Sequence, residues 1–364
     1  MKIGVYKIGM AAPNDVSGLK ALIESGAVDP ATIVALIGKT EGNGGANDFT
    51  RGYATLSFQL LLAPLLGLPP AEVGARIAFV WSGGTEGVLS PHATIFTRAP
   101  ADAAESPRLA LGIRVTRDLA PEEIGRMAMV ELVAGAVREC MAQTGITDPQ
   151  AVHYVQVKGP LLTPARIADA RGRGAALATE DPNGSKAFAR GAMALGVALG
   201  LDEVDAAGLS DSAIARKLDL FSSVASTSAG GELTNCEVLL FGNSPAYGGD
   251  YRIGHATLRD VIDSEGVRAA LASAGLGGSG GLSAEEASRV AAVFAKAEAS
   301  PTGCIRGRRN TMLSDADIHY ERHARAALGA VIASITHDPA IFVSGGTEHQ
   351  CAPGAAPIAA IVRV

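Results

Sequence analysis

A short motif that occurs three times constrains the fold of this chain more than any other feature of its sequence. It reads Ser-Gly-Gly-Thr-Glu at residues 82–86 and again at residues 344–348, and a looser copy, Ser-Ala-Gly-Gly-Glu, lies at residues 228–232. An apolar run typical of a β-strand follows each copy. Three widely spaced copies indicate an internal repeat, so we expect one structural unit to occur three times along the chain.

A lysine and an arginine precede the serine of each motif, always in the same order. The lysine follows a predicted buried strand, the arginine opens or lies within a predicted helix, and the serine follows the next strand. The three sets are Lys39, Arg51 and Ser82; Lys158, Arg190 and Ser228; and Lys296, Arg322 and Ser344. A single lysine or arginine is most often a solvated surface charge, but the threefold recurrence favours one shared polar site.

Strand and helix patterns alternate along the chain, which predicts an α/β (α+β) fold of three repeat units at residues 1–103, 108–246 and 251–364. The abundance of glycine (44 residues) and the low aromatic content (4%) suit close packing of helices on sheets. A surface loop is expected at residues 275–281, and Ser283 is expected to cap a helix. Strands are predicted at residues 2–8, 32–38, 76–81, 93–96, 108–116, 151–157, 236–241, 251–258, 290–295, 340–343 and 358–364, and helices at 15–25, 51–66, 121–143, 185–199, 258–273 and 317–334.

Charge, cysteine content and hydrophobicity indicate which partners and which cellular location to expect. The net charge of -6 disfavours nucleic acid or an anionic membrane as the main partner. The four cysteines form no CxxC pair, which indicates reduced thiols. The N-terminal residues lack the apolar core of a signal peptide, and no apolar run is long enough to span a bilayer. We therefore expect a cytoplasmic protein.

Serine beside lysine suggests hydrolytic chemistry. A neutral lysine amine can take the serine proton, and the alkoxide then attacks a carbonyl carbon. Several cations crowded into one buried site would lower the lysine pKa, and glycine N–H groups next to the serine could hold the developing oxyanion. Three arginines suit a small planar ligand with several carbonyl oxygens. The pattern therefore predicts hydrolysis of an amide or imide, with the glycine-rich loop at residues 40–48 in contact with the ligand.

The motifs at residues 82–86, 228–236 and 344–350, together with the three Lys-Arg-Ser sets, resemble the cyanuric acid hydrolase and barbiturase family over the whole chain. The resemblance implies three similar domains around a pseudo-threefold axis, with a central β-barrel, helices outside, and assembly into a homotetramer. It also implies a role in s-triazine degradation. Cyanuric acid would be opened to carboxybiuret, which loses carbon dioxide to give biuret.

The resemblance also assigns residue roles. Ser228 is implied as the nucleophile and Lys158 as its base, while Lys39 and Lys296 belong to supporting dyads. The sequence alone does not exclude the neighbouring Ser226 as the nucleophile. The positions that match the substrate-binding residues of the family are Arg51, Ser82, Gly83, Arg190, Ser228, Ala229, Arg322, Ser344 and Gly345.

No catalytic metal or organic cofactor is implied, but a structural divalent cation is. Its oxygen-rich ligand set suits magnesium or calcium. Glu298 is implied as the carboxylate ligand, with a solvated or lysine-paired carboxylate as the alternative. The glutamates of the three motifs, Glu86, Glu232 and Glu348, are expected to hold neighbouring lysines or arginines. The main-chain carbonyls implied as further ligands are those of Thr347, Gln350, Cys351, Ala352 and Ala355.

Two other functions remain open at the level of sequence. A barbiturase would use the same fold and dyad to convert barbituric acid to ureidomalonate. A non-catalytic protein would bind a small metabolite without changing it, although three serine–lysine pairs disfavour that reading.

Overall fold

The strands form three four-stranded sheets that share one order and one set of directions. The computed structural model describes residues 1–45, 47–277 and 281–364. In each sheet the last strand along the chain pairs antiparallel with the first and the second, and the third runs parallel to the second at one edge. In spatial order the strands are β1 (Lys2–Gly9), β4 (His92–Ala99), β2 (Ile33–Thr40) and β3 (Ala78–Gly83); β5 (Arg108–Val115), β8 (Glu237–Ser244), β6 (Val152–Pro160) and β7 (Ala225–Gly230); and β9 (Tyr251–Leu258), β14 (Ala356–Arg363), β10 (Val290–Ala297) and β13 (Phe342–Gly345).

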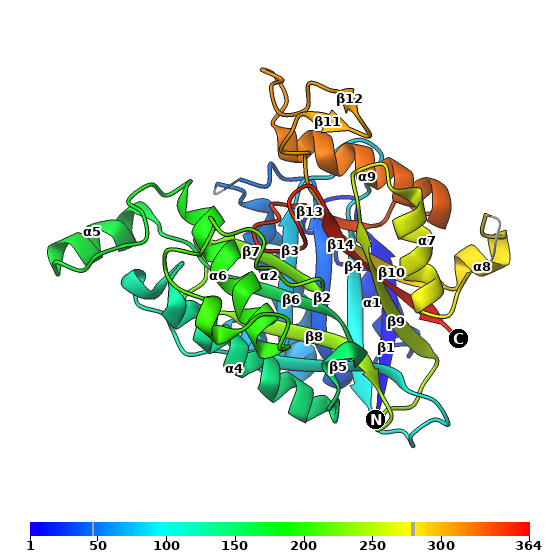
Figure 1. Cartoon of the computed structure of the whole chain (residues 1–364). Coiled ribbons are helices and arrows are strands. Elements are labelled where there is room, and N and C mark those ends of the chain that lie inside the picture. Colours follow the sequence, from blue (N-terminus) through cyan, green and yellow to red (C-terminus); the bar gives the residue numbers. More distant parts are fainter. Residues whose placement is uncertain (46, 278–280) are drawn as a thin grey trace.

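Helices pack beside each sheet. Figure 1 shows α4 and α6 together beside the β5–β8 sheet, and α7 and α9 together beside the sheet that contains β9 and β10. A short ladder of β11 (Cys304–Ile305) and β12 (Arg308–Arg309) projects near α9 (Figure 1). The helices are α1 (Ser17–Glu24), α2 (Thr50–Leu66), α3 (Pro70–Arg76), α4 (Met127–Thr144), α5 (Pro164–Gly172), α6 (Ser185–Gly200), α7 (Ser264–Ser273), α8 (Ala284–Ser288) and α9 (Tyr320–Thr336).

Two predicted helices begin later than their sequence pattern suggested. The pattern at residues 121–143 predicted one helix, but Pro121–Glu123 forms a separate 3-10 turn and α4 begins at Met127. Gly125 lies between them at φ 74°, a left-handed conformation that interrupts a helix. The predicted helix at 258–273 begins only at Ser264, because residue 258 belongs to β9 and Asp263 caps the helix by accepting a hydrogen bond from the backbone N–H of Gly266.

The other predicted elements are found with end shifts of a few residues. Ser283 caps α8 as predicted, and its hydroxyl accepts a hydrogen bond from the N–H of Glu286. The predicted loop at residues 275–281 includes 278–280, which lie outside the described residues, as does residue 46 of the loop at 40–48.

Aromatic residues of all three sheets meet in one buried core. Phe96 of β4, Phe241 of β8 and Phe294 of β10 have ring centroids 5.1 to 6.4 Å apart. Tyr154 of β6 stacks on Phe294 at 4.9 Å. In addition, β1 packs against β5 and β10, and β5 packs against β9. The three sheets therefore share one hydrophobic interior, although their outer faces pack against different helices.

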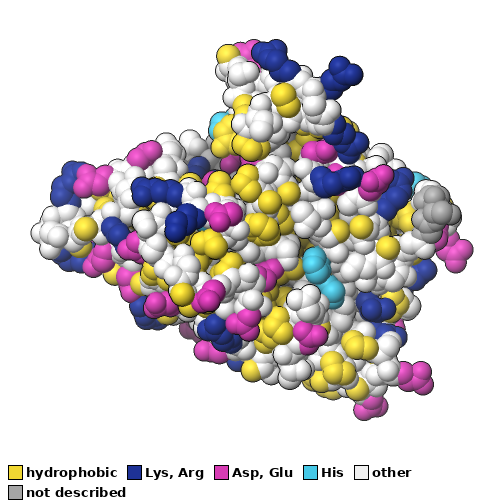
Figure 2. All heavy atoms as spheres, viewed as in Figure 1, with side chains coloured by type: hydrophobic (Ala, Val, Ile, Leu, Met, Phe, Trp, Pro, Cys, Tyr) yellow, Lys and Arg dark blue, Asp and Glu magenta, His cyan; other side chains and the backbone are white. Residues whose placement is uncertain are grey.

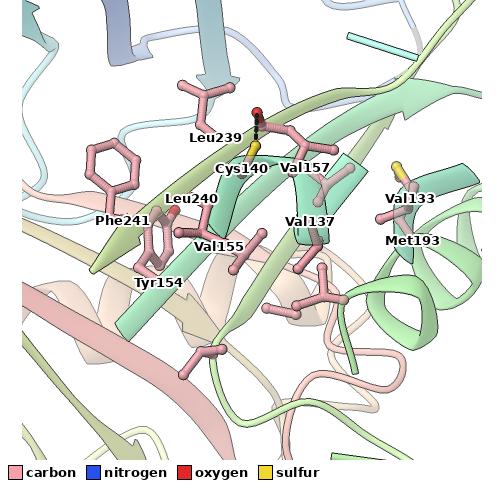
Figure 3. Packing of buried hydrophobic residues seen from close by; sticks show 14 of the residues in the cluster. Val133, Val137, Cys140, Tyr154, Val155, Val157, Met193, Leu239, Leu240 and Phe241 are labelled. Carbon is pink, nitrogen blue, oxygen red and sulfur yellow. Dashed lines mark hydrogen bonds between the residues drawn. The ribbon is translucent and has the colours of Figure 1, made fainter. Parts of the chain in front are cut away.

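Small residues allow the helices to approach closely, as the glycine content predicted. Figure 3 shows Val133 and Val137 of α4 beside β-strand residues such as Val157, with Met193 of α6 nearby. A Cβ atom added to Gly196 of α6 would lie only 2.6 Å from the Cβ of Val133. Glycine at that position is therefore required for the α4–α6 contact.

The predicted central barrel is not found. Among the residues that the structure describes, the strands form separate four-stranded sheets, and no sheet closes on itself. Closure would require hydrogen bonds between the edge strands of neighbouring sheets, and the described strands of different sheets are not paired.

The surface of the protein carries charges of both signs. Figure 2 shows acidic and basic side chains interspersed over the viewed face. Within the described ranges no single helix is long and apolar enough to cross a bilayer; α2 and α3 together reach that length and composition, but they meet at a 90° bend.

Candidate active site

Each of the three lysines lies directly opposite its serine on a neighbouring parallel strand. The sequence placed these residues just after the strands, whereas the structure places them inside the paired segments, because pairing continues for one or two residues beyond each lysine and serine. The position is thus the carboxyl end of two adjacent parallel strands, where side chains from both strands reach the same edge. The facing pairs are Lys39 and Ser82, Lys158 and Ser228, and Lys296 and Ser344.

Lys39 joins its own serine to another sheet. Its side chain is fully buried, and its Nζ lies 3.1 Å from Oγ of Ser82 and 3.3 Å from the carbonyl oxygen of Gly83. The same Nζ donates to the carbonyl oxygen of Val343 on β13 at 2.8 Å. Val343 immediately precedes Ser344, so this lysine brings two of the three serine motifs together.

Lys296 makes the corresponding contacts one sheet further on. It is fully buried, and its Nζ donates to the carbonyl oxygen of Gly345 at 2.9 Å and to that of Thr227 on β7 at 2.8 Å. Thr227 immediately precedes Ser228. The two lysines therefore link all three serine-bearing strands, which is the convergence that the repeated sequence pattern predicted.

Burial shifts both of these amines toward the neutral form. Burial lowers the pKa of Lys39 well below its ordinary value, and the nearby charges of Arg325 and Lys296 lower it further. Burial also lowers the pKa of Lys296 to about 7, with Arg190 acting in the same direction. A substantial fraction of these side chains can therefore be neutral near neutral pH, as a lysine base requires.

Lys158 has a different environment. Its Nζ lies 2.9 Å from the carboxylate of Glu232, the glutamate of its own motif. Burial alone would raise the pKa of Glu232, but the charges of Lys158 and Arg51 outweigh burial and lower it. Ser228 is partly exposed, and the Glu232 side chain retains 41% of its accessible surface. Lys158 itself is 4% exposed. Among the described residues it is the only one of the three lysines with a directly paired carboxylate.

The glutamates of the other two motifs hold arginines that come from another repeat. Arg190 of α6 donates to Glu348 through two bonds of 2.7 Å, and Arg325 of α9 donates to Glu86 through bonds of 2.8 and 2.6 Å. Glu321 lies within 4 Å of both guanidinium groups. Such two-bond pairs fix the plane of the guanidinium group.

The third arginine of the site is Arg325, one helical turn beyond the predicted Arg322. The Arg322 side chain is exposed and donates to the carbonyl oxygen of Asn43 at 3.2 Å. Arg325 is only 4% exposed and pairs with Glu86. The structure thus does not bring Arg322 into the buried cluster. No local sequence signal separates the two arginines, because both lie on the same helix and only Arg325 pairs with Glu86.

The remaining predicted residues surround these groups. Arg51 is 9% exposed and donates to the carbonyl oxygen of Gly45 at 3.1 Å, which ties α2 to the loop at 40–48. Ser344 is buried, whereas Ser82 and Ala229 are partly exposed. A Cβ atom on Gly83 would meet Asp48 Oδ2 at 1.6 Å, so glycine is required for that close approach.

Ser226, the alternative nucleophile, lies in a separate polar network. It is 1% exposed, and its Oγ donates to Oε1 of Gln156 at 3.1 Å. Tyr154 donates to the same amide oxygen at 2.6 Å. The Ser226 hydroxyl therefore belongs to the core and not to the partly exposed edge where Ser228 lies.

Glu298 and the loop at residues 347–355 have features that suit a hard cation. The Glu298 carboxylate accepts a hydrogen bond from the Thr347 hydroxyl; burial raises its pKa, and the charges of Glu348 and Glu321 raise it further. Backbone turns close from Thr347 to Gln350 and from Ala352 to Ala355. Within the described residues no three His, Cys, Asp or Glu side chains cluster as metal ligands, but ligation by main-chain carbonyls needs no such cluster.

The chain is similar over its whole length to known hydrolases. Residues 4–363 match the model of the amidohydrolase ring-opening protein family. A cyclic amide hydrolase of Azorhizobium caulinodans is 72% identical over 365 residues, and a cyanuric acid amidohydrolase of Enterobacter cloacae is 52% identical over 368, with both chains of each pair covered completely. A solved structure described as "Cyanuric acid hydrolase: evolutionary innovation by structural concatenation" is 50% identical, with a TM-score of 0.94 over 100% of this chain and 99% of that chain.

The fold, the site and these matches define a class of enzyme, the hydrolases of cyclic amides. Within that class the chain belongs to the family of ring-opening amidohydrolases.

Proposed function

We propose that this enzyme opens the ring of cyanuric acid by hydrolysis to carboxybiuret, which then loses carbon dioxide to give biuret. The observation that carries the proposal is the bonding of Lys39 and Lys296 across sheets, which draws three lysine–serine pairs toward one centre. A small planar ring with three carbonyl groups fits a centre that offers hydroxyl, amine and guanidinium donors from three directions. The named relatives support the same substrate.

Ser228 is proposed as the nucleophile and Lys158 as its base. Lys158 takes the proton of the Ser228 hydroxyl while Oγ forms a bond to a ring carbonyl carbon. The C–N bond of the ring breaks, and the proton passes from the ammonium group to the departing ring nitrogen. Water then releases the acyl group from Ser228. Glu232, 2.9 Å from Lys158, stabilises the ammonium group that this sequence creates.

Ser82 and Lys39 are the second candidate pair, because their side chains are the ones that lie within hydrogen-bond distance. The 3.1 Å contact and the two carbonyl acceptors of Lys39 match a neutral amine that donates two N–H groups and accepts the serine proton. A carboxylate partner is not among the hydrogen bonds of Lys39, whereas Lys158 has Glu232 at 2.9 Å.

The names of the relatives leave a second ring open as the substrate. The relative at 72% identity is named for a cyclic amide without a stated ring, whereas cyanuric acid appears in the name of the relative at 52%. Barbituric acid, opened to ureidomalonate, is therefore the alternative. Incubation of the purified enzyme with each ring separately, followed by product identification, tests both. Biuret from cyanuric acid alone supports the proposal; ureidomalonate alone supports the alternative; an intact ring in both tubes would mean that the protein only binds.

We further propose that Glu298 and the carbonyl groups of the 347–355 loop hold a structural magnesium or calcium ion. Burial raises the pKa of this partly buried carboxylate, and the charges of Glu348 and Glu321 raise it further. A divalent cation would offset the negative charge gathered there. Calcium or magnesium should raise the melting temperature of the wild-type protein but not that of Glu298→Gln. An equal rise in both proteins would place the ion elsewhere.

The three units at residues 1–103, 108–246 and 251–364 are proposed to be related by a pseudo-threefold axis. The strand order that the three sheets share supports this relation. So do the contacts between units: Lys39 of the first unit binds the third, and Lys296 of the third binds the second. We also propose that the enzyme is a cytoplasmic homotetramer. The four cysteines are free thiols, which suits a reducing compartment, and the exposed apolar face of α2 supports assembly.

A further inference from the structure

We infer that Gln350 is a positioning residue that fixes the backbone of Thr227, the residue before Ser228. Its carboxamide is fully buried, and Oε1 accepts a hydrogen bond from the backbone N–H of Thr227 at 2.8 Å. On the other side, Nε2 donates to the carbonyl oxygen of Gly346 at 3.1 Å. The side chain thus connects the third serine motif to the strand that carries the second.

Every polar atom of Thr227 takes part in a hydrogen bond. Its N–H is bound by Gln350 and its carbonyl oxygen by Nζ of Lys296, while its own hydroxyl donates to the carbonyl oxygen of Arg190 at 3.0 Å. Its side chain is fully buried. Because Ser228 is the next residue, these bonds fix the backbone from which its Cα–Cβ bond projects.

The anchor is reinforced by the loop that carries Gln350. Ser222 forms two backbone hydrogen bonds with this loop, from its N–H to the carbonyl oxygen of His349 and from the N–H of Cys351 to its own carbonyl oxygen. His349 and Cys351 lie at φ 58° and 69°, so the loop is held in a conformation that non-glycine residues rarely adopt. Such strain persists only where the surrounding bonds require it.

The other two motifs have no equivalent of this side chain. Gln350 comes six residues after Ser344; the same position after Ser82 is Val88, which is 51% exposed, and after Ser228 it is the exposed Thr234. Neither can anchor a buried strand of a neighbouring sheet. The asymmetry singles out Ser228 among three otherwise similar serines, and the inference rests on its proposed role as the nucleophile.

The test is Gln350→Met, which keeps the volume of the side chain but removes both hydrogen bonds. We expect kcat to fall about 10–100-fold with KM changed less than about threefold, since a small misplacement of the nucleophile affects chemistry more than binding. In hydrogen–deuterium exchange of the folded protein, the amide of Thr227 should exchange at least about tenfold faster, because it loses its acceptor.

Asn243 provides a matched control. Its buried carboxamide also bridges two sheets, with Nδ2 donating to the carbonyl oxygen of Ile253 at 2.7 Å and Oδ1 accepting from its N–H at 3.0 Å. It lies on β8 six residues beyond Glu237, the partner of Lys158 in register, or about 20 Å along the strand. Asn243→Leu should lower the melting temperature as Gln350→Met does, while leaving kcat unchanged.

Three results would overturn the inference: equal kcat in Gln350→Met and Asn243→Leu, a loss of activity confined to KM, or unchanged exchange at Thr227. Failure of the proposed function is separately visible. If Ser228→Ala retained turnover, the nucleophile assignment would be wrong, yet the exchange measurement would still decide whether Gln350 anchors Thr227.

Discussion

At the scale of single residues, the decisive difference among the three pairs is what each lysine contacts. Lys39 and Lys296 donate hydrogen bonds to carbonyl oxygens of other sheets, whereas Lys158 is paired with Glu232 beside a partly exposed serine. A base must change protonation during turnover without loosening the fold. Lys158 can do so, because the structure gives it no carbonyl acceptor in another sheet among the described residues.

We therefore expect Ser228→Ala and Lys158→Met to lower kcat by about three orders of magnitude or more, as loss of a nucleophile or its base usually does. Ser82→Ala should lower kcat/KM by about 10-fold through lost binding, the worth of one hydrogen bond to the substrate. Steady-state kinetics with cyanuric acid measures all three. The reverse order, with Ser82→Ala inactive and Ser228→Ala active, would move the nucleophile to the first repeat.

Lys296 gives a prediction about stability. Its pKa is about 7 in the folded protein against an ordinary value of 10.5, so between these values the unfolded chain binds a proton that the folded protein does not. The free energy of unfolding must then rise with pH across this window, by at most about 1.4 kcal/mol per pH unit from this group.

Lys296→Met should show a shallower rise than wild type from pH 7 to 10 when both are unfolded in urea. Parallel curves for the two proteins would mean that Lys296 stays protonated in the fold. Subtracting the unfolding free energy of the variant from that of the wild type at each pH removes the contribution of every other titrating group.

At the scale of elements, helix α9 shows where sequence reasoning reached its limit. The order of lysine, arginine and serine in each repeat is local information, and the structure confirmed that the lysines and serines face one another. The choice between Arg322 and Arg325 is not local, because residues three apart lie on neighbouring parts of one helical surface. Only the tertiary position of Glu86, far away in the sequence, distinguishes them.

Other differences have the same origin. The late start of α4 was visible in principle at Gly125, whereas the absence of a closed barrel depends on how three sheets meet, which no local pattern encodes. Gln350 could not have been recognised from the sequence as a partner of Thr227, since a glutamine in a loop has no signature until its neighbours are known.

The two arginines of α9 therefore give a paired test. Arg325→Ala should raise KM and lower kcat, together reducing kcat/KM by about 100-fold or more, because it removes a buried guanidinium and leaves Glu86 without its partner. Arg322→Ala, an exposed change on the same helix, should stay within about twofold of wild type. Comparable losses in both variants would show that Arg322 turns inward when substrate binds.

At the scale of the whole molecule, helix α2 presents an apolar face that none of the described residues covers. Ala54, Phe58 and Leu62 pack inward, and the only charged residue of the helix, Arg51, is buried. The exposed large apolar side chains of the helix and its N-cap are Phe49 (83% exposed), Tyr53 (51%), Leu56 (48%), Leu60 (55%) and Leu65 (50%). A helix that is apolar on all sides is normally buried on all sides.

We expect a second copy of this chain to cover that face. Together these side chains expose roughly 500 Å² if each has about 180 Å² in full exposure, which is a large part of the ~800 Å² per partner that a stable interface hides. A stripe without charge is also complementary to itself, as a twofold interface requires. Because α2 begins beside Arg51, assembly would also hold one end of the candidate active site.

Leu60→Glu should therefore reduce the molar mass measured by light scattering, to half or less at micromolar protein, because the interface cannot bury an unpaired carboxylate. Val115→Glu places the same charge on an exposed apolar residue of β5 and should leave the mass unchanged. Since α2 and α3 together reach the composition of a membrane segment, flotation with neutral lipid vesicles gives the competing outcome: binding by wild type and not by Leu60→Glu, with equal masses, would assign this face to lipid instead of to a second copy.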